Sequence, residues 1–313
     1  HAALQGSARA SAASYPGETI DDLETIAYDV ADGVASVILD RPERRNAIDA
    51  RMADETLVVA RAIAADPSVR AVLIAGNGPS LTVGGDIDHF LTATPGTIGS
   101  VAARMTTTFH EAFRVLGRID APIVTAAHGS VAGGGLGFLY AADVVFASTD
   151  ALFCTAFSGI GLSGDGGGTW HLPRMIGALR ARRMYVENLR VDATTAEQWG
   201  LVSEVVASEE LRNRALTTAR RLATGPTKGF GHQRRLLRES WSRSLSEQLT
   251  AETEAIEVTG NSHDAQQAVT VTKPARLLAN SKGTGKAVRD LDPGMMLYPT
   301  GNKDGMMWEV EDE

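Results

Sequence analysis

The first regular pattern of apolar and polar positions is strand-like. It runs from Ile26 to Leu39, and Asp32-Gly33 within it is a dipeptide typical of tight hairpin turns. Asp40-Arg41-Pro42 ends the strand pattern. We therefore expect extended structure with a hairpin turn at the start of the ordered chain.

Helical and strand-like patterns then alternate. Apolar residues recur at helical spacing over residues 50–65 and 105–116, whereas short apolar runs at 69–75 and 122–127 are typical of buried strands. This alternation predicts an α/β architecture with crossover helices. After Gly168 the pattern is mostly helical, and we expect helices over residues 169–184, 194–199, 209–223, 227–237 and 245–258.

The two ends of the chain differ from this middle part. Residues 1–20 are rich in Ala, Ser and Gly, and we expect a disordered segment that carries the remnant of an expression tag. Residues 21–205 are expected to form the core and residues 206–272 a C-terminal helical region. Residues 273–313 are polar and lack periodicity, so we expect an extended or disordered tail, with a partner-wrapping arm as the alternative.

Composition narrows the class of protein. The 313 residues include 30 Lys and Arg against 38 Asp and Glu, and this net charge of −8 disfavours a general nucleic-acid binder. The single cysteine, Cys154, excludes an intramolecular disulfide and a multi-cysteine zinc site, so we expect no metal and a cytoplasmic location. The most apolar stretch, residues 121–147, is interrupted by glycines and Asp143, so no membrane span is predicted.

Two glycine-bearing segments are candidates for anion binding. Residues 81–87 follow a buried strand and contain Gly84-Gly85-Asp86, where exposed backbone N–H groups can stabilise a developing oxyanion. Residues 128–137 run from a strand through Gly133-Gly134-Gly135 into a helix, whose N-terminal N–H groups can face a ligand. A plain turn and close helix–sheet packing are the structural alternatives.

A third segment holds one carboxylate among small residues. Asp165 lies between Gly164 and Gly166-Gly167-Gly168, just before a predicted helix. Such a side chain is available for acid–base chemistry if the loop faces a pocket. Capping the next helix or forming a turn is an equally open role, because Asp does both routinely.

The order of these segments resembles the crotonase (enoyl-CoA hydratase/isomerase) superfamily over about residues 26–269. The matching motifs are Arg-Pro…Arg-Asn-Ala-Ile, Val-Gly-Gly-Asp-Ile, Gly-Gly-Gly-Leu-Gly…Ala-Asp-Val, Gly-Gly-Thr-Trp…Leu-Pro-Arg-Met-Ile-Gly and Ala-Glu-Gln-Trp-Gly-Leu-Val. The resemblance implies a spiral of ββα units with a C-terminal helical trimerisation region, and a homotrimer or dimer of trimers. It also implies an acyl-CoA substrate, with coenzyme A as part of that substrate and no separate cofactor.

The resemblance also assigns roles to single positions. The two N–H donors of the family's oxyanion hole fall on Gly85 and Gly134. The two glutamates of the hydratases would fall at Gly137 and Phe157, so both are absent. What remains is Asp165, which is similar to the acid/base of the ring-type enoyl-CoA isomerases of phenylacetate degradation. The same position resembles the nucleophile of 4-chlorobenzoyl-CoA dehalogenase and an aspartate of the carbon–carbon-cleaving diketone hydrolases.

We favour isomerase-type proton transfer by Asp165. The alternatives are hydration by another route, carbon–carbon hydrolysis, dehalogenation with His110 as the base, and a non-catalytic acyl-CoA-binding homologue. Further substrate-binding candidates are Arg45, Ala47, Val83, Asp86 and Ile87 by the family pattern, with Arg44 as a second cation for the CoA phosphates. Phe138, Phe157, Leu162 and Trp170 are candidates for an apolar wall that raises the carboxylate pKa, with ordinary core packing as the alternative.

Overall fold

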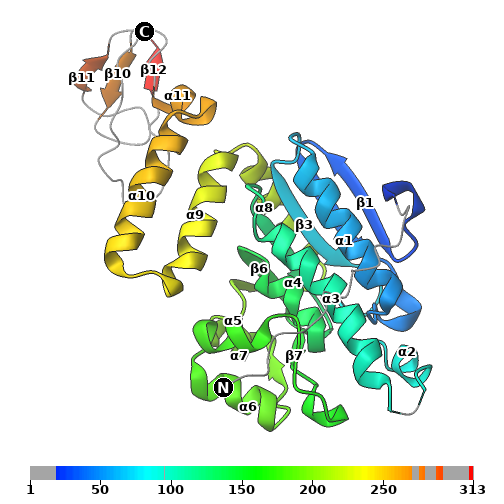
Figure 1. Ribbon diagram of the computed structural model, residues 1–313. Coiled ribbons are helices and arrows are strands. Elements are labelled where there is room, and N and C mark those ends of the chain that lie inside the picture. The colour runs from blue at the N-terminus through cyan, green and yellow to red at the C-terminus, as the bar shows by residue number, and fades with distance from the viewer. Residues whose placement is uncertain (1–18, 95, 270–274, 279–286, 292–309, 313) are drawn as a thin grey trace, which may run out of the picture. The chain divides into compact units, whose positions relative to one another are not determined.

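The computed structural model describes residues 19–94, 96–269, 275–278, 287–291 and 310–312, with side chains described for residues 19–94 and 96–266 (Figure 1). The chain divides into two compact units, residues 1–119 with 123–220, and residues 120–122 with 221–313. The division falls within helix α8 (Leu211–Ala223), later in the chain than the expected boundary after residue 205. The expectations for residues 1–18, and for most of the tail, lie outside the described residues.

A six-stranded sheet is the centre of the first unit. Its strands, in spatial order, are β1 (Ile26–Ala31), β2 (Val34–Leu39), β3 (Ala71–Gly76), β4 (Ile123–Ala127), β6 (Val144–Ser148) and β9 (Glu204–Val206). Only β1 runs antiparallel to its neighbour, and the β1–β2 turn at Asp32 and Gly33 has positive φ at both residues, as such a hairpin requires. All residues of β3 and β4 are buried, as expected for parallel strands covered on both faces.

A second, three-stranded sheet and several helices complete this unit. The strands are β5 (Ser130–Ala132), β7 (Leu152–Cys154) and β8 (Val191–Asp192). The helices are α1 (Ala50–Ala65), α2 (Ile87–Leu91), α3 (Ile98–Leu116), α4 (Gly137–Tyr140), α5 (Gly168–Met175), α6 (Ala178–Val186) and α7 (Ala193–Trp199). Helices α1 and α3 lie side by side (Figure 1). The α/β architecture predicted from the alternating pattern is confirmed.

One element prediction was wrong. The helix expected over residues 169–184 is two helices, α5 and α6, separated at Gly177. Gly177 has φ +85°, a conformation that glycine adopts readily and other residues do not. The apolar spacing on either side continues across this break, so the periodicity concealed it.

The second unit is helical, with a small sheet at the C-terminal end. Its helices are α9 (Thr227–Glu239), α10 (Leu245–Gly260) and α11 (His263–Val269), and its strands are β10 (Ala275–Leu278), β11 (Ala287–Leu291) and β12 (Val310–Asp312). Ser244 caps α10 in a reciprocal pair with Glu247. Arg235 forms an ion pair of 2.7 Å with Asp120, which joins α9 to residues 120–122. The trimerisation role of this region stays a prediction.

Candidate active site

The loop that precedes α5 presents Asp165. Gly164, Gly166 and Gly167 around it have φ of +133°, +63° and +82°, so a side chain at any of the three would strain the backbone. Helix α5 begins after Gly167, and no side chain caps it. Asp165 is therefore not the helix cap that its sequence context also allowed.

The Asp165 carboxyl group lies over the Cα atom of Gly134. A Cβ atom at Gly134 would overlap the Oδ1 atom of Asp165, so a glycine is required at this contact. Oδ1 is buried and has no hydrogen-bond partner among the residues that the structure describes. Burial raises the pKa of Asp165 to about 6, because weakly polar surroundings disfavour the charged form. A carboxyl group with this pKa can both accept and return a proton near neutral pH.

The two predicted oxyanion loops lie against each other beside this carboxyl group. A Cβ atom at Gly84 would lie 2.7 Å from the carbonyl oxygen of Ala132 and 3.2 Å from the Cα atom of Gly133. Within residues 19–94 and 96–266, the Gly85 N–H has no acceptor. Gly134 is the second residue of the 3₁₀ turn Gly133–Leu136, and such positions leave their N–H groups without a partner inside the helix. The fold thus brings Gly134 to Asp165 and places the Gly84-Gly85 turn next to the Gly133-Gly134 turn.

His110, on α3, holds the Asp165 loop. Its Nε2 atom accepts a hydrogen bond of 2.9 Å from the backbone N–H of Gly166. Burial, and then the charge of Arg114, lower the pKa of His110 below its ordinary value. Both effects favour the neutral ring, which is the form that can accept this hydrogen bond.

Two tyrosines that the sequence analysis did not single out flank the same loop. A Cβ atom at Gly168 would lie 3.2 Å from the Tyr140 hydroxyl oxygen and would overlap the Tyr185 hydroxyl oxygen. Burial, and then the charge of Asp165, raise the pKa of Tyr185 to about 12. The Tyr140 hydroxyl is buried without a hydrogen-bond partner in the described part of the chain. The three glycines after Asp165 were the signal in the sequence that large side chains pack against this loop, because Gly168 makes room for the two tyrosine rings.

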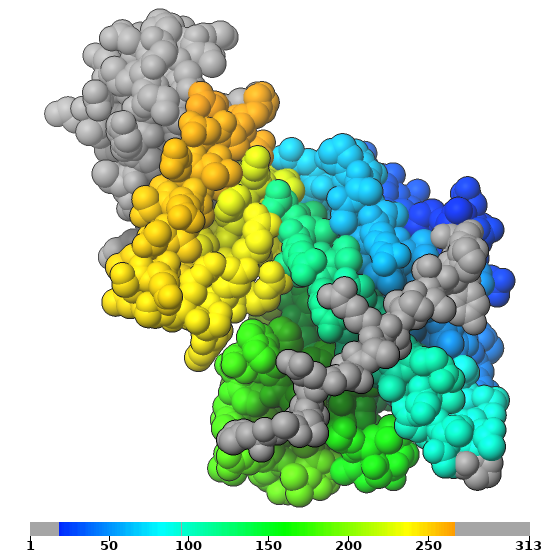
Figure 2. Space-filling model, in the orientation of Figure 1, coloured from blue at the N-terminus to red at the C-terminus, as the bar shows by residue number. Residues whose placement is uncertain are grey.

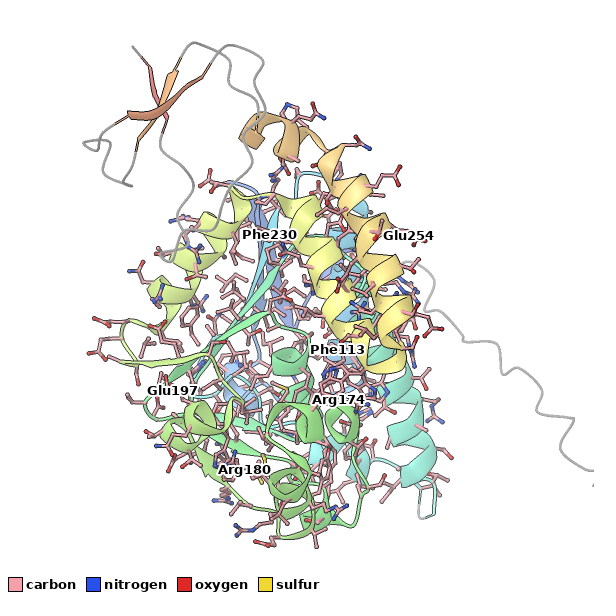
Figure 3. The ribbon with its side chains drawn as sticks, turned by 90° about the vertical axis from the view of Figure 1, so that its left-hand side faces the viewer. Phe113, Arg174, Arg180, Glu197, Phe230 and Glu254 are labelled. Carbon is pink, nitrogen blue, oxygen red and sulfur yellow. The ribbon has the colours of Figure 1, made fainter. Side chains whose placement is uncertain are left out.

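The position of the first hydratase glutamate is filled by an aromatic ring. A Cβ atom at Gly137 would overlap the ring of Phe113, which α3 carries (Figure 3). The rings of Phe109, Phe113 and Phe138 pack edge to face, with centroids 4.7–5.6 Å apart. Phe138 is 1% exposed, so it is a core residue, and Phe113 supplies the surface beside Gly137.

At the second glutamate position, Phe157 is also buried. Its ring stacks on Tyr185 with the centroids 6.1 Å apart. This contact connects Phe157 to Tyr185 beside the Asp165 loop, and its part in an apolar wall around Asp165 stays a prediction. Leu162 is only half-buried, and its backbone N–H donates to the Phe157 carbonyl at 3.0 Å.

Asp86 and Arg44 have structural partners that their predicted binding roles did not anticipate. Asp86 caps α2 and forms ion pairs with Arg44 at 3.1 Å and Arg41 at 3.4 Å. Burial would raise the pKa of Asp86, but hydrogen bonds from Arg44 and the His89 N–H, with the charges of both arginines, hold it below its ordinary value. Arg44 also pairs with Asp88. The Arg44 guanidinium group is thus shared by two carboxylates, and its role toward the CoA phosphates stays a prediction.

Three further binding candidates differ in how exposed they are. Trp170 is 40% exposed, and the Arg174 guanidinium lies 4.1 Å from its ring centroid, so its ring is not the buried wall that we expected. Ile87 is 46% exposed on α2, the helix within the segment that Figure 2 shows in cyan. Ala47 is buried, and its carbonyl accepts a 2.6 Å hydrogen bond from Arg41.

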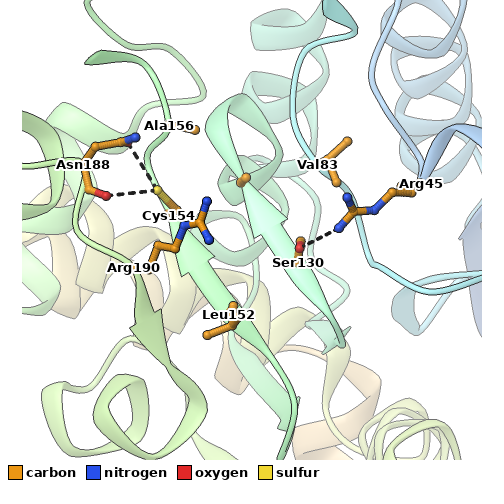
Figure 4. A pocket seen from close by; sticks show the side chains of 9 residues that line it. Arg45, Val83, Ser130, Leu152, Cys154, Ala156, Asn188 and Arg190 are labelled. Atoms are coloured by element: carbon orange, nitrogen blue, oxygen red, sulfur yellow. Dashed lines mark hydrogen bonds between the residues drawn. The ribbon is translucent and has the colours of Figure 1, made fainter. Parts of the chain in front are cut away.

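Arg45 and Val83 line a pocket of about 280 Å³ (Figure 4). In the described part of the chain, no group of three or more His, Cys, Asp or Glu side chains could hold a metal ion. No helix among the described residues is long and apolar enough to cross a membrane.

Comparison with known proteins identifies the family of this chain. Residues 29–274 match the family model for enoyl-CoA hydratase/isomerase, so the chain belongs to that family of the crotonase superfamily. It is 30% identical to 1,2-epoxyphenylacetyl-CoA isomerase of Escherichia coli (strain K12), over 79% of this chain and 94% of that protein. It is also 30% identical to 4-chlorobenzoyl coenzyme A dehalogenase-2 of an Arthrobacter species, over 70% of this chain and 80% of that protein.

Solved structures show that the fold is the crotonase fold. A crystal structure titled putative enoyl-CoA hydratase/isomerase from Mycobacterium abscessus superposes with a TM-score of 0.74 at 38% identity, covering 78% of this chain and 94% of that one. A putative enoyl-CoA hydratase from Streptomyces coelicolor A3(2) gives a TM-score of 0.73 at 28% identity, covering 84% and 93%.

Proposed function

We propose that this acyl-CoA enzyme of the crotonase superfamily is an isomerase that moves a proton between two carbons of an enoyl-CoA thioester. Asp165 is its single acid/base, and coenzyme A enters as part of the substrate. The observation that carries the proposal is the buried carboxyl group of Asp165, which has an unpartnered oxygen, a pKa of about 6, and direct contact with Gly134.

The reaction follows from this geometry. Asp165 takes a proton from a carbon next to the double bond, and the electron pair of that C–H bond shifts toward the thioester oxygen to give an enolate. The N–H groups of Gly85 and Gly134 donate hydrogen bonds to this oxygen, and donors of this kind contribute roughly 3–4 kcal/mol each in the transition state. Protonated Asp165 then returns the proton, on the same face, to the carbon at the far end of the conjugated enolate. The double bond has moved, so the product is an isomer of the substrate.

Two competing reactions, hydration and dehalogenation, have less support in the site. Hydration by a carboxylate pair requires a second acid or base, but Gly137 faces the Phe113 ring and position 157 holds a buried phenylalanine. Dehalogenation is the second candidate, since two relatives are 4-chlorobenzoyl coenzyme A dehalogenases and His110 lies beside the Asp165 loop. It requires a base that activates water, whereas the Nε2 atom of His110 already accepts the Gly166 N–H.

A substrate screen in deuterated water tests the proposal. The enzyme is incubated with 2- and 3-enoyl-CoAs, aryl-CoAs including 4-chlorobenzoyl-CoA, and β-keto thioesters, and the products are analysed by mass spectrometry. We expect an isomeric product that contains deuterium, lost in Asp165→Asn and retained in the control Asp29→Asn on the exposed side of β1.

Other mass changes in the same screen would overturn the proposal. Gain of one water by an enoyl-CoA would indicate a hydratase. Replacement of chlorine by hydroxyl would indicate a dehalogenase, and fragmentation of a β-keto thioester would indicate a carbon–carbon hydrolase. Binding of these thioesters without any change in mass would indicate a non-catalytic homologue.

A further inference from the structure

Thr82 lies at the point where the backbone joins the two glycine turns. It is fully buried and stands two residues before the Gly84-Gly85 turn. Its N–H donates to the Ser130 carbonyl at 3.3 Å, and its carbonyl accepts from the Ala132 N–H at 3.1 Å. Ala132 immediately precedes the Gly133-Gly134 turn, so these two bonds connect the segments that lead into both turns.

The hydroxyl group of Thr82 holds the first turn. It donates to the Asn46 carbonyl at 2.6 Å and accepts the Gly84 N–H at 3.2 Å, which uses both the donor and the acceptor capacity of a hydroxyl. The Gly84 carbonyl accepts the Ile48 N–H at 2.8 Å. The Gly85 N–H belongs to the same planar peptide as that carbonyl and points the opposite way. Fixing Gly84 at both ends therefore fixes the direction of the Gly85 N–H.

The methyl group of Thr82 packs against the second turn. A Cβ atom at Gly135 would overlap the Thr82 Cγ2 atom and would lie 3.1 Å from its Oγ1 atom. Gly135 is buried and follows Gly134 directly in the 3₁₀ turn. The two ends of one side chain thus contact the two turns that carry the proposed N–H donors.

We propose that Thr82 is a positioning residue that sets the spacing and direction of the two N–H donors at Gly85 and Gly134. This inference rests on the proposed function, in which those donors stabilise the enolate oxygen. Such donors are effective only when they are aimed in advance at the developing charge, and small displacements of the reacting groups are costly. Serine at position 82 would keep the hydroxyl without the methyl, and valine would keep a methyl without the hydroxyl. Threonine provides both contacts.

The carbonyl stretch of a bound thioester tests this role without turnover. Butyryl-CoA labelled with ¹³C at its carbonyl has no double bond to move, and infrared difference spectra report how strongly that carbonyl accepts hydrogen bonds. We expect the band to move to lower frequency on binding to the parent enzyme, and to move less in Thr82→Val and in Thr82→Ser. We also expect kcat with the substrate found in the screen to fall roughly tenfold or more in Thr82→Val, with little change in the dissociation constant of butyryl-CoA.

Thr56→Val is the matched control. Thr56 is also buried, at 3% exposed, and its hydroxyl donates to the Met52 carbonyl within α1 at 2.6 Å. The substitution removes a buried hydroxyl of the same kind without touching either glycine turn. Its carbonyl band and kcat should equal those of the parent.

A reciprocal exchange tests the methyl contact separately. Gly135→Ala brings a second methyl into the space that the Thr82 methyl fills, so it should reduce the shift of the carbonyl band. Adding Thr82→Ser removes the original methyl, and the double variant should recover part of the shift that Gly135→Ala loses. Thr82→Ser and the double variant retain the hydroxyl, so they decide the question if Thr82→Val does not fold.

The outcomes separate this role from the proposed function. A parent-like band in either Thr82→Val or Thr82→Ser would overturn the positioning role of Thr82, and so would a double variant no better than Gly135→Ala. A parent enzyme that binds butyryl-CoA without any shift of the band would instead contradict the pair of N–H donors, and the inference would fall with it. Loss of isomerase activity alone leaves the infrared result intact, because butyryl-CoA is not turned over.

Discussion

Two loops of this protein each hold a carboxylate away from bulk water, but the two carboxylates differ in their hydrogen bonds and in the direction of their pKa shifts. Asp86, at the start of α2, is 4% exposed and receives hydrogen bonds from backbone N–H groups and from two arginines. Asp165, before α5, has one buried oxygen with no partner and lies against a glycine Cα. The pKa of Asp86 is therefore lowered, whereas that of Asp165 is raised to about 6.

This difference separates a structural carboxylate from the one that we propose to be reactive. The Asp86 carboxylate has its hydrogen-bonding capacity occupied, so it stabilises the turn that positions Gly85. The Asp165 carboxyl group keeps unused capacity beside the site where we place the thioester. A buried polar group without a partner costs stability, so its persistence is a feature that function explains better than folding does.

We expect the largest effect from Asp165→Asn, which should impair catalysis. The amide keeps the shape of the side chain but cannot accept and return a proton, so kcat should fall by roughly 10²–10⁴-fold. The dissociation constant for an acyl-CoA should change little. Steady-state kinetics with the substrate found in the screen, together with calorimetry of substrate binding, measure both. A loss of binding equal to the loss of kcat would instead assign Asp165 to substrate recognition.

His110 sharpens the comparison by testing what holds the reactive loop. His110→Phe removes the acceptor for the Gly166 N–H, and we expect kcat to fall by roughly tenfold, the scale of a lost hydrogen bond to a buried donor. His110→Gln offers a carbonyl oxygen in place of Nε2 and should recover part of this loss. If His110 were itself a base for water, glutamine would not rescue activity, and the phenylalanine and glutamine variants would be equally impaired.

Thermal stability should change in opposite directions when each carboxylate is neutralised. The raised pKa of Asp165 means that its contribution to stability is fully present below the unfolded pKa and is lost as pH rises through about 6. Asp165→Asn avoids this loss, so at pH 8 it should be more stable than the parent by roughly 1–3 kcal/mol. Denaturant unfolding at pH 8 and pH 5 measures this, and equal differences at both values would contradict the assigned titration.

Asp86→Asn should show the opposite sign and a smaller pH-dependent effect. Its lowered pKa contributes stability above the unfolded pKa, and that contribution is lost as pH falls through the folded value. Asparagine can still cap α2, so the substitution isolates the charge, and we expect a loss of about 1–2 kcal/mol at neutral pH. The same unfolding experiment checks this. An unchanged midpoint would show that Asp49 and Asp88 suffice as partners for the two arginines.

The sequence predicted the architecture and the segments that meet at the candidate site, because both depend on local signals. The hairpin at Asp32-Gly33, the two glycine turns and the carboxylate at Asp165 are each encoded within a few residues. Long-range partners were not visible in the same way. Nothing local to Asp86 or Arg44 shows that they pair, and the apolar spacing of α3 gives no sign that Phe113 faces Gly137 while His110 reaches Gly166.

The most direct test of the central claim is the pH dependence of deuterium exchange into the substrate's carbon-bound hydrogens. Exchange by the parent enzyme reports proton removal itself and needs no assumption about product release. Because ionised Asp165 is the base, we predict that the exchange rate rises with pH to a plateau, with its midpoint near 6, and that Asp165→Asn abolishes it. Exchange that is flat between pH 5 and 8, or that survives in Asp165→Asn, would contradict the assignment of Asp165 as the acid/base.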